Sequence, residues 1–168
     1  MEKWKEELAQ LPESEYKKQF YRKIETYLDE GHGSQILRNP VAAIIVQDSL
    51  LFGHPERYDL RAWAVMPTHV HCLLAPAEGW SLSRIMHDHK SFTSHEIGKK
   101  FKLPGQQWQT ENYDRYIRNA DHLARVVDYI EWNPVKANLC ADPKEWPYSS
   151  ANPVAREKRD LRDKGSSK

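Results

Sequence analysis

The hydrophobic positions along the chain follow two different periods. Up to about residue 53 they recur every three or four residues, which predicts one helix before residue 31 and a second that begins at Pro40 and is capped by Asn39. Farther along, apolar and polar residues alternate, and a tight turn divides this stretch into strands over 58–66 and 69–75. The pattern therefore predicts an antiparallel hairpin in the middle of the fold.

Helical spacing returns in the second half of the chain. A helix is expected to begin after Ser81, which serves as its N-cap, and another to run from Asp121 to Asn133, where Pro134 closes it. Between these two helices, the segment 107–117 predicts a further strand.

Length and composition favour one compact domain with a tail. The chain has 168 residues, of which 39% are hydrophobic and 29% charged, enough to bury a core. Residues 152–168 are polar and predict a disordered tail, which leaves 1–151 as the domain. The sequence has no signal peptide and no apolar stretch of about 18 residues, so we expect an intracellular protein. Cys72 and Cys140 are too few for a disulfide framework or a four-thiolate zinc site.

The net charge limits how the chain can bind nucleic acid. The 25 Lys and Arg residues and the 24 Asp and Glu residues give a formal net charge of +1. This balance excludes binding that depends on bulk charge alone, but it does not exclude a local basic cleft.

Two His-x-His patterns differ in what they can bind. On a strand, residues i and i+2 project from one face about 6–7 Å apart, whereas on a helix they point about 200° apart. His69 and His71 lie in a strand pattern and are candidate metal ligands; the alternative is two polar residues on the solvent face of the sheet. The other pair lies in a helix pattern, where we expect His89 to pack against the sheet and His87 to face solvent.

Tyr129 and Asn133 lie one turn apart on one flank of the last predicted helix. The alternative to a functional role is an amphipathic tyrosine at the core boundary and a helix-ending asparagine. A tyrosine hydroxyl can attack a phosphodiester when a divalent cation withdraws charge from the phosphate. Two imidazoles and an amide oxygen could hold such an ion with positions left for phosphate oxygens, and imidazole favours Zn²⁺ or Mn²⁺ over Mg²⁺.

Several motifs resemble the single-tyrosine HUH transposases. The run 64–74 (AVMPTHVHCLL) is similar to their central strand with its His-hydrophobic-His motif, and 129–137 (YIEWNPVKA) is similar to their catalytic helix. Shorter segments resemble one branch of this family, the REP-associated tyrosine transposases, which are relatives of the small insertion-sequence transposases. These segments are 90–93, 108–109, 114–118 and 146–150. The motifs occur in the family's order between about residues 15 and 151.

The resemblance implies a fold, a site and a reaction. The fold would be α+β, with a ferredoxin-like antiparallel sheet and helices packed on it, as in HUH endonucleases. His69, His71 and Asn133 would ligate Mg²⁺ or Mn²⁺, and Tyr129 would be the nucleophile. Attack would give a 5′-phosphotyrosine and a free 3′-OH, so that single-stranded DNA is nicked and rejoined beside a palindromic hairpin. The protein would act on hairpin DNA as a monomer or homodimer in the cytoplasm, associated with the nucleoid, without a membrane or an organic cofactor.

The positions of basic residues and of tyrosines indicate which side chains would contact DNA and which would be the nucleophile. Basic side chains between and around the proposed catalytic elements are expected to bind DNA, namely Arg84, Lys90, Lys99, Lys100, Lys102, Arg115, Arg118 and Lys136. Three other tyrosines compete for the role of nucleophile, namely Tyr113, Tyr116 and Tyr148. Tyr129 is preferred because it has an amide partner four residues on within a predicted helix; Tyr148 has Asn152 at the same spacing, but outside any predicted helix.

One departure from the family leaves a second function open. Relatives begin with a β-strand ahead of the region where this chain starts, so we expect the first strand of the sheet to be missing and the domain 1–151 to be short at its N-terminus. The alternative function is a DNA-hairpin binding protein that kept the fold but lost cleavage. A metal-dependent hydrolase of another kind is disfavoured, because no third His or carboxylate stands at a recognisable spacing from His69 and His71.

Overall fold

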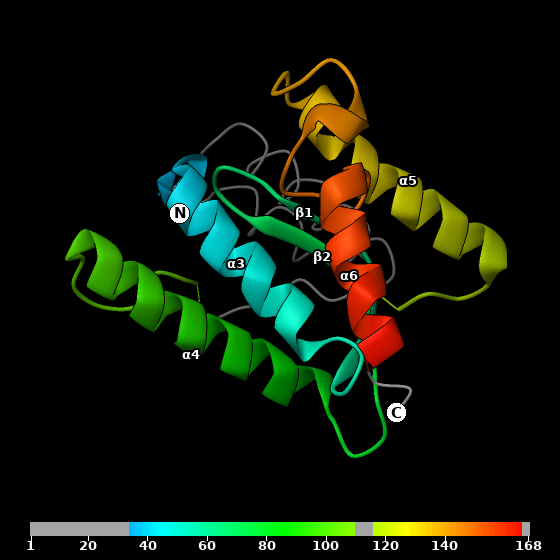
Figure 1. Ribbon diagram of the computed structural model, residues 1–168, viewed down its shortest axis with the longest axis horizontal. Helices are drawn as coiled ribbons and strands as arrows, with labels where there is room; N and C mark the ends of the chain where they lie inside the picture. Colours follow the sequence, from blue (N-terminus) through cyan, green and yellow to red (C-terminus); the bar gives the residue numbers. More distant parts are fainter. Residues whose placement is uncertain (1–33, 110–115, 166–168) are drawn as a thin grey trace, which may run out of the picture.

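The computed structural model describes residues 34–109 and 116–165 and confirms the α+β class. Its elements, in chain order, are η1 (Ile36–Arg38), α3 (Pro40–Gly53), β1 (Tyr58–Val65), β2 (Val70–Pro76), α4 (Leu82–Phe101), α5 (Ala120–Lys136), η2 (Pro143–Glu145) and α6 (Pro153–Gly165). The hairpin β1–β2 lies in the middle, with α3 and α4 on one side and α5 on the other (Figure 1). Two predictions concern the N-terminal segment, namely a helix before residue 31 and the absence of the first strand of the sheet. This segment lies outside the described residues.

Local signals in the sequence set where the helices begin. The side chain of Asn39 accepts a hydrogen bond from the amide of Val41 at 2.9 Å, and Ser81 accepts one from the amide of Arg84 at 3.2 Å. Each bond satisfies a backbone donor that has no partner inside its helix. Both predicted N-caps are therefore confirmed.

The hairpin is antiparallel and carries one irregularity. Val65 pairs with Val70 and Ala64 with His71, and the register shifts between Leu60 and Ala62. Such a bulge places one extra residue on its strand, so Leu60 and Ala62 point to opposite faces although they are two positions apart. The two faces of the hairpin are buried by different helices.

One face packs against α3, α4 and α6, and the other against α5. Tyr58, Leu60 and Trp63 are fully buried in a cluster with residues of α3, α4 and α6. On the opposite face Ala62 and Ala64, both with 0% exposure, lie in a cluster with residues of α5. Side chains as small as alanine let a helix approach the sheet closely, which brings α5 onto the strand that carries the histidines.

The segment after η2 extends the sheet at the free edge of β1. The amide of Val65 donates to the carbonyl of Tyr148, and the amide of Ser150 donates to the carbonyl of Trp63, each at 2.9 Å. The indole of Trp146 also donates to the carbonyl of Val65 at 3.0 Å. The motif at 146–150 therefore has a structural role, since it satisfies the backbone of β1.

The prediction of a disordered tail over 152–168 is wrong, because α6 occupies most of it. Arginine side chains hold this polar helix to the body of the protein. The guanidinium of Arg162 donates to the carbonyls of Phe52 and His54, each at 2.9 Å, and Arg159 donates to the carbonyl of Leu60 at 3.3 Å. Ion–carbonyl bonds of this kind stabilise a helix that has little apolar surface to bury.

Two boundary predictions also need correction. The described residues of the predicted strand 107–117 form no strand, and Trp108 instead packs against α4, where its indole donates to Thr93 Oγ1 at 2.7 Å. Residues 110–115 lie outside the described part. Pro134 does not close α5, which continues to Lys136, because a proline in the last turn removes only one hydrogen bond from the helix.

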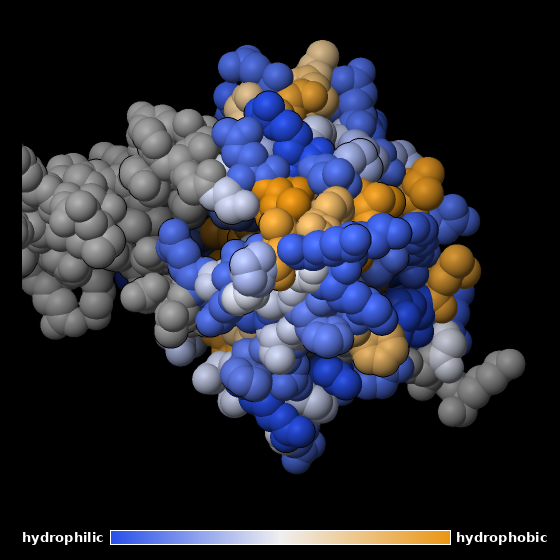
Figure 2. Space-filling view, turned by 90° about the vertical axis from the view of Figure 1, so that its left-hand side faces the viewer, coloured by the Kyte–Doolittle hydropathy of each residue, from blue (hydrophilic) through white to orange (hydrophobic). Residues whose placement is uncertain are grey.

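None of the helices in the described residues combines the length and the hydrophobicity needed to cross a bilayer. Hydrophobic residues do reach the surface of α3, where Val41 and Ile44 are 41% and 44% exposed. Figure 2 shows the face at the left of Figure 1, on which a group of hydrophobic residues is surrounded by hydrophilic ones.

Candidate active site

The two histidines of the strand motif face each other at the start of β2. His69 immediately precedes the strand and His71 is its second residue. Their Nε2 atoms are 2.9 Å apart, and their rings meet edge to face with centroids separated by 4.6 Å. The pleat of a strand places residues i and i+2 on one side, which accounts for the pairing.

Burial keeps both imidazoles neutral. It lowers the pKa of His69 to about 4, and burial together with smaller contributions from His69 and Lys136 lowers the pKa of His71 to about 3. His69 is only 8% exposed, so it does not lie on a solvent face. The hydroxyl of Thr68 lies 2.9 Å from His69 Nδ1, which leaves the Nε2 atom of His69 directed toward His71. Neutral imidazoles are the form that binds metal ions.

Tyr129 lies beside this histidine pair. Its ring meets that of His71 edge to face, with centroids 5.6 Å apart. The helix that carries it is fixed by Ile130, which is 4% exposed and packs against Ala62 and Ala64 of β1. The structure therefore brings a phenol next to two neutral imidazoles, as the spacing of the motifs predicts.

Asn133 lies one turn farther along α5 and is 1% exposed. Its Nδ2 atom donates to the carbonyl of Tyr129 at 3.3 Å. Among the described residues, no hydrogen bond uses its Oδ1 atom. The amide oxygen is therefore available as an acceptor or as a ligand.

The donor chemistry of these residues fits a divalent cation. The described ranges contain no group of three or more His, Cys, Asp or Glu that could hold a metal ion, so a third protein ligand would have to be of another type. Two neutral imidazoles and an amide oxygen form such a set, and they leave coordination positions for oxygens of a substrate.

The basic side chains expected to bind DNA do not gather in one patch. Arg84 lies at the start of α4, Lys99, Lys100 and Lys102 lie at its end, and Lys136 lies at the end of α5. In Figure 1 the C-terminal end of α4 lies at the far left, whereas that of α5 lies at the top of the molecule. Lys90 donates a hydrogen bond to the carbonyl of Gln109 at 2.6 Å. Arg118 lies shortly before α5, and Arg115 lies outside the described residues.

His87 and His89 point in different directions, as expected for residues two positions apart on a helix. The side chain of His87 is 79% exposed, whereas His89 packs between Ser49 Oγ and Tyr58 Oη, each 2.7 Å from a ring nitrogen. Both predictions are confirmed. Thr68 is a further residue of this site that was not predicted, although its position directly before the His-x-His motif is a usable signal for a partner of His69.

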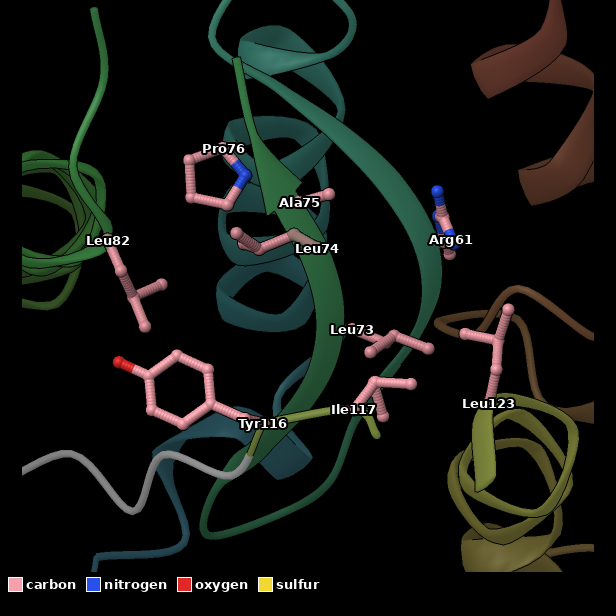
Figure 3. A pocket seen from close by; sticks show the side chains of 9 residues that line it. All are labelled: Arg61, Leu73, Leu74, Ala75, Pro76, Leu82, Tyr116, Ile117 and Leu123. Atoms are coloured by element: carbon pink, nitrogen blue, oxygen red, sulfur yellow. The ribbon is translucent and has the colours of Figure 1, made fainter. Parts of the chain in front are cut away.

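A hollow that the sequence did not predict follows the outer side of β2 (Figure 3). It has a volume of about 410 Å³. Its lining is mostly apolar and consists of Arg61, Leu73, Leu74, Ala75, Pro76, Leu82, Tyr116, Ile117 and Leu123. Tyr116, one of the competing tyrosines, is 86% exposed at its rim and belongs to this hollow rather than to the histidine pair.

Comparisons with known proteins agree with the motifs. Residues 53–133 match the family model described as "Transposase IS200 like", a range that contains His69, His71, Tyr129 and Asn133. The chain is 35% identical over 95 residues to the REP-associated tyrosine transposase of Escherichia coli K12, and 30% identical over 104 residues to a putative REP-associated tyrosine transposase of Haemophilus influenzae Rd. Each alignment covers 55% of this chain, and 54% and 58% of the respective relatives.

A solved structure is similar to most of the described fold. It is the structure of a REP-associated tyrosine transposase bound to a REP hairpin, which matches with a TM-score of 0.61 and 28% identity. The match covers 75% of this chain and 74% of that chain. The family resemblance inferred from the motifs is therefore confirmed, while the chain spans little more than half of the length of the curated relatives it matches.

Proposed function

We propose that this chain is a metal-dependent single-stranded DNA endonuclease and strand transferase that nicks and rejoins DNA beside palindromic hairpins. The observation that carries the proposal is the contact of the Tyr129 ring with His71, whose Nε2 atom lies 2.9 Å from that of His69. The similarity to REP-associated tyrosine transposases, one of them bound to a REP hairpin, supports hairpin DNA as the substrate.

The reaction assigned to Tyr129 is a transesterification. Its hydroxyl oxygen bonds to the scissile phosphorus, the bond from phosphorus to the 3′ oxygen breaks, and that oxygen takes up the proton which the phenol gives up. The products are a 5′-phosphotyrosine and a free 3′-OH. Attack of a 3′-OH on the phosphotyrosine reverses the process and rejoins a strand, so no external energy source is needed.

His69, His71 and Asn133 would hold Mg²⁺ or Mn²⁺. Such an ion withdraws charge from the phosphate, which matters because a tyrosine hydroxyl with an ordinary pKa of about 10 is a weak nucleophile at neutral pH. The residues themselves orient the site: Thr68 fixes the ring of His69, and the buried amide of Asn133 is held against the carbonyl of Tyr129.

A covalent adduct between protein and DNA tests the proposal. Single-stranded oligonucleotides with hairpins from the flanking genome are incubated with the protein in Mn²⁺ or EDTA, and the products are separated on a denaturing gel. We expect an adduct that requires Mn²⁺, is lost in Tyr129→Phe, and persists in the control Tyr116→Phe, a residue that is 86% exposed and lines the hollow beside β2.

The other outcomes identify the alternatives. Hairpin binding without any adduct in the parent protein would favour a binding protein that kept the fold but lost cleavage. Metal-dependent strand hydrolysis that is unchanged in Tyr129→Phe would favour a hydrolase of another kind.

A further inference from the structure

Lys136 places a positive charge next to the proposed nucleophile. It stands seven residues after Tyr129 on α5, which is two turns and therefore the same side of the helix. Its Nζ atom lies 4.7 Å from the centroid of the Tyr129 ring. An ammonium group over the face of a tyrosine is attracted by the negative face of the ring. The ring of Tyr129 thus contacts both the ring of His71 and the ammonium group of Lys136.

The ammonium group retains its hydrogen-bonding capacity. Within the described residues, Lys136 forms no hydrogen bond or ion pair, so its three N–H donors remain for solvent or a ligand. Glu131, the carboxylate two residues after Tyr129, is already occupied by Ser150 at 2.8 Å and Arg156 at 2.9 Å. Among the described residues, this carboxylate therefore does not pair with the ammonium group of Lys136.

The charge of Lys136 also opposes the positive charge that the site would gain with a metal ion. Two cations close together in a partly buried site repel each other, and an anion that lies between them offsets this repulsion. A phosphodiester is the anion that the proposed reaction brings there, and lysine binds phosphate oxygens as a point charge.

We propose that Lys136 binds a non-bridging oxygen of the phosphate that Tyr129 attacks, and so holds that phosphate and the tyrosine ring in one arrangement. This inference rests on the proposed function. It differs from a general contribution to DNA affinity, because it assigns the lysine to one phosphate of the substrate. A purely structural role, in which a lysine in the last turn stabilises the helix dipole, would not depend on the charge of that phosphate.

The test removes the charge from each partner in turn. The scissile linkage is first mapped from the adduct of the parent protein. Binding is then measured in EDTA with Tyr129→Phe, which keeps the aromatic ring but cannot react, on oligonucleotides with either the natural phosphate or a neutral methylphosphonate at that linkage. The same two oligonucleotides are measured with Lys136→Met, Lys136→Arg and Lys99→Met added to Tyr129→Phe.

With Lys136 present, we expect the neutral linkage to weaken binding about fivefold, and with Lys136→Met we expect the two oligonucleotides to bind equally. Lys136→Arg keeps the charge and should keep the difference. Lys99→Met, at the far end of α4, should weaken binding of both oligonucleotides alike. A difference between the linkages that persists in Lys136→Met would overturn the inference alone, whereas absence of an adduct in the parent protein would overturn it together with the proposed function.

Discussion

Arg156 of α6 is bound to Glu131 of α5, with Nη2 and Oε1 2.9 Å apart. Ser150 donates to the same carboxylate oxygen at 2.8 Å, and its hydroxyl also accepts the amide of Trp63 at 3.1 Å. One carboxylate, 17% exposed, therefore links α5 to α6 and, through Ser150, to β1. Because Tyr129 lies two residues before Glu131, this network fixes the part of α5 that carries the proposed nucleophile.

Replacing Glu131 should therefore destabilise the fold. In Glu131→Ala, Ser150 and Arg156 lose an acceptor in a partly buried place, so we expect the free energy of unfolding to fall by about 1–3 kcal/mol. The measurement is the urea midpoint at constant m-value. Asp128→Ala removes the same charge from an exposed position of α5 and should change stability by less than about 0.5 kcal/mol. Equal effects of the two substitutions would mean that the network contributes nothing specific.

His89 makes the stability of the protein depend on pH. Tyr58 donates its hydroxyl proton to the carbonyl of Leu50 at 2.7 Å, so His89 Nε2–H donates to Tyr58, and His89 Nδ1 can accept from Ser49. These bonds suit a neutral ring. Burial, with a further contribution from the charge of Arg57, lowers the pKa of His89 to about 4 from its ordinary value of 6.5.

Stability should consequently decline as the pH falls from 6.5 toward 4. In that window the unfolded chain binds a proton at His89 that the folded protein does not, so the free energy of unfolding rises with pH. The full effect of this one group is about 3 kcal/mol. Urea unfolding across the window should show a smaller slope in His89→Gln than in the parent protein, and an unaltered slope in His87→Gln, whose side chain is 79% exposed. Parallel pH curves for all three proteins would contradict the assignment.

Gly53 is required by the close approach of Tyr58. A Cβ atom at position 53 would overlap the phenol ring of Tyr58, which is fully buried and hydrogen-bonded to Leu50 and His89. The ring cannot move without breaking these bonds, so we expect Gly53→Ala to lower the unfolding free energy by about 2–3 kcal/mol. Gly165→Ala, where nothing lies within 4 Å of the added atom, is the matched control and should be nearly neutral in the same thermal or urea titration.

The local patterns in the sequence were sufficient to predict the hairpin and which candidate side chains lie on one side of it. A period of two placed His69 and His71 on one side of a strand, and helical spacing placed Tyr129 and Asn133 on one flank of α5. The bulge at Leu60–Ala62 was not predictable, because the alternation looks continuous across it.

Long-range polar contacts were the part that the sequence did not reveal. Helix α6 is held by hydrogen bonds such as that from Arg162 to the carbonyl of Phe52. Because polar side chains make these contacts, the sequence of α6 has no hydrophobic periodicity that would predict a packed helix. The pairing of Ser150 with Trp63 likewise joins residues 87 positions apart. Pro134 suggested a helix end at residue 133, but tertiary packing of α5 outweighs the loss of one backbone bond.

The amide of Asn133 should matter more for metal-supported cleavage than for hairpin binding. In Asn133→Ala the proposed third ligand is lost while the described basic side chains stay in place, so we expect the rate of adduct formation to fall at least about tenfold and the Mn²⁺ requirement to rise. Hairpin affinity, measured by fluorescence anisotropy in EDTA, should change by less than about twofold. The buried amide also donates to the carbonyl of Tyr129, so the melting temperature of the variant is measured alongside.

His87→Ala provides the matched control for this prediction. The histidine is exposed on α4, which packs on the face of the hairpin opposite to α5, and its ring cannot reach the His69–His71 pair. Adduct formation in His87→Ala should stay within about twofold of the parent rate, whereas His69→Ala should abolish it. Equal losses of cleavage and hairpin affinity in Asn133→Ala would assign that residue a structural role only. A loss in His87→Ala as large as that in His69→Ala would contradict the metal site itself, because the two histidines lie on different sides of the sheet.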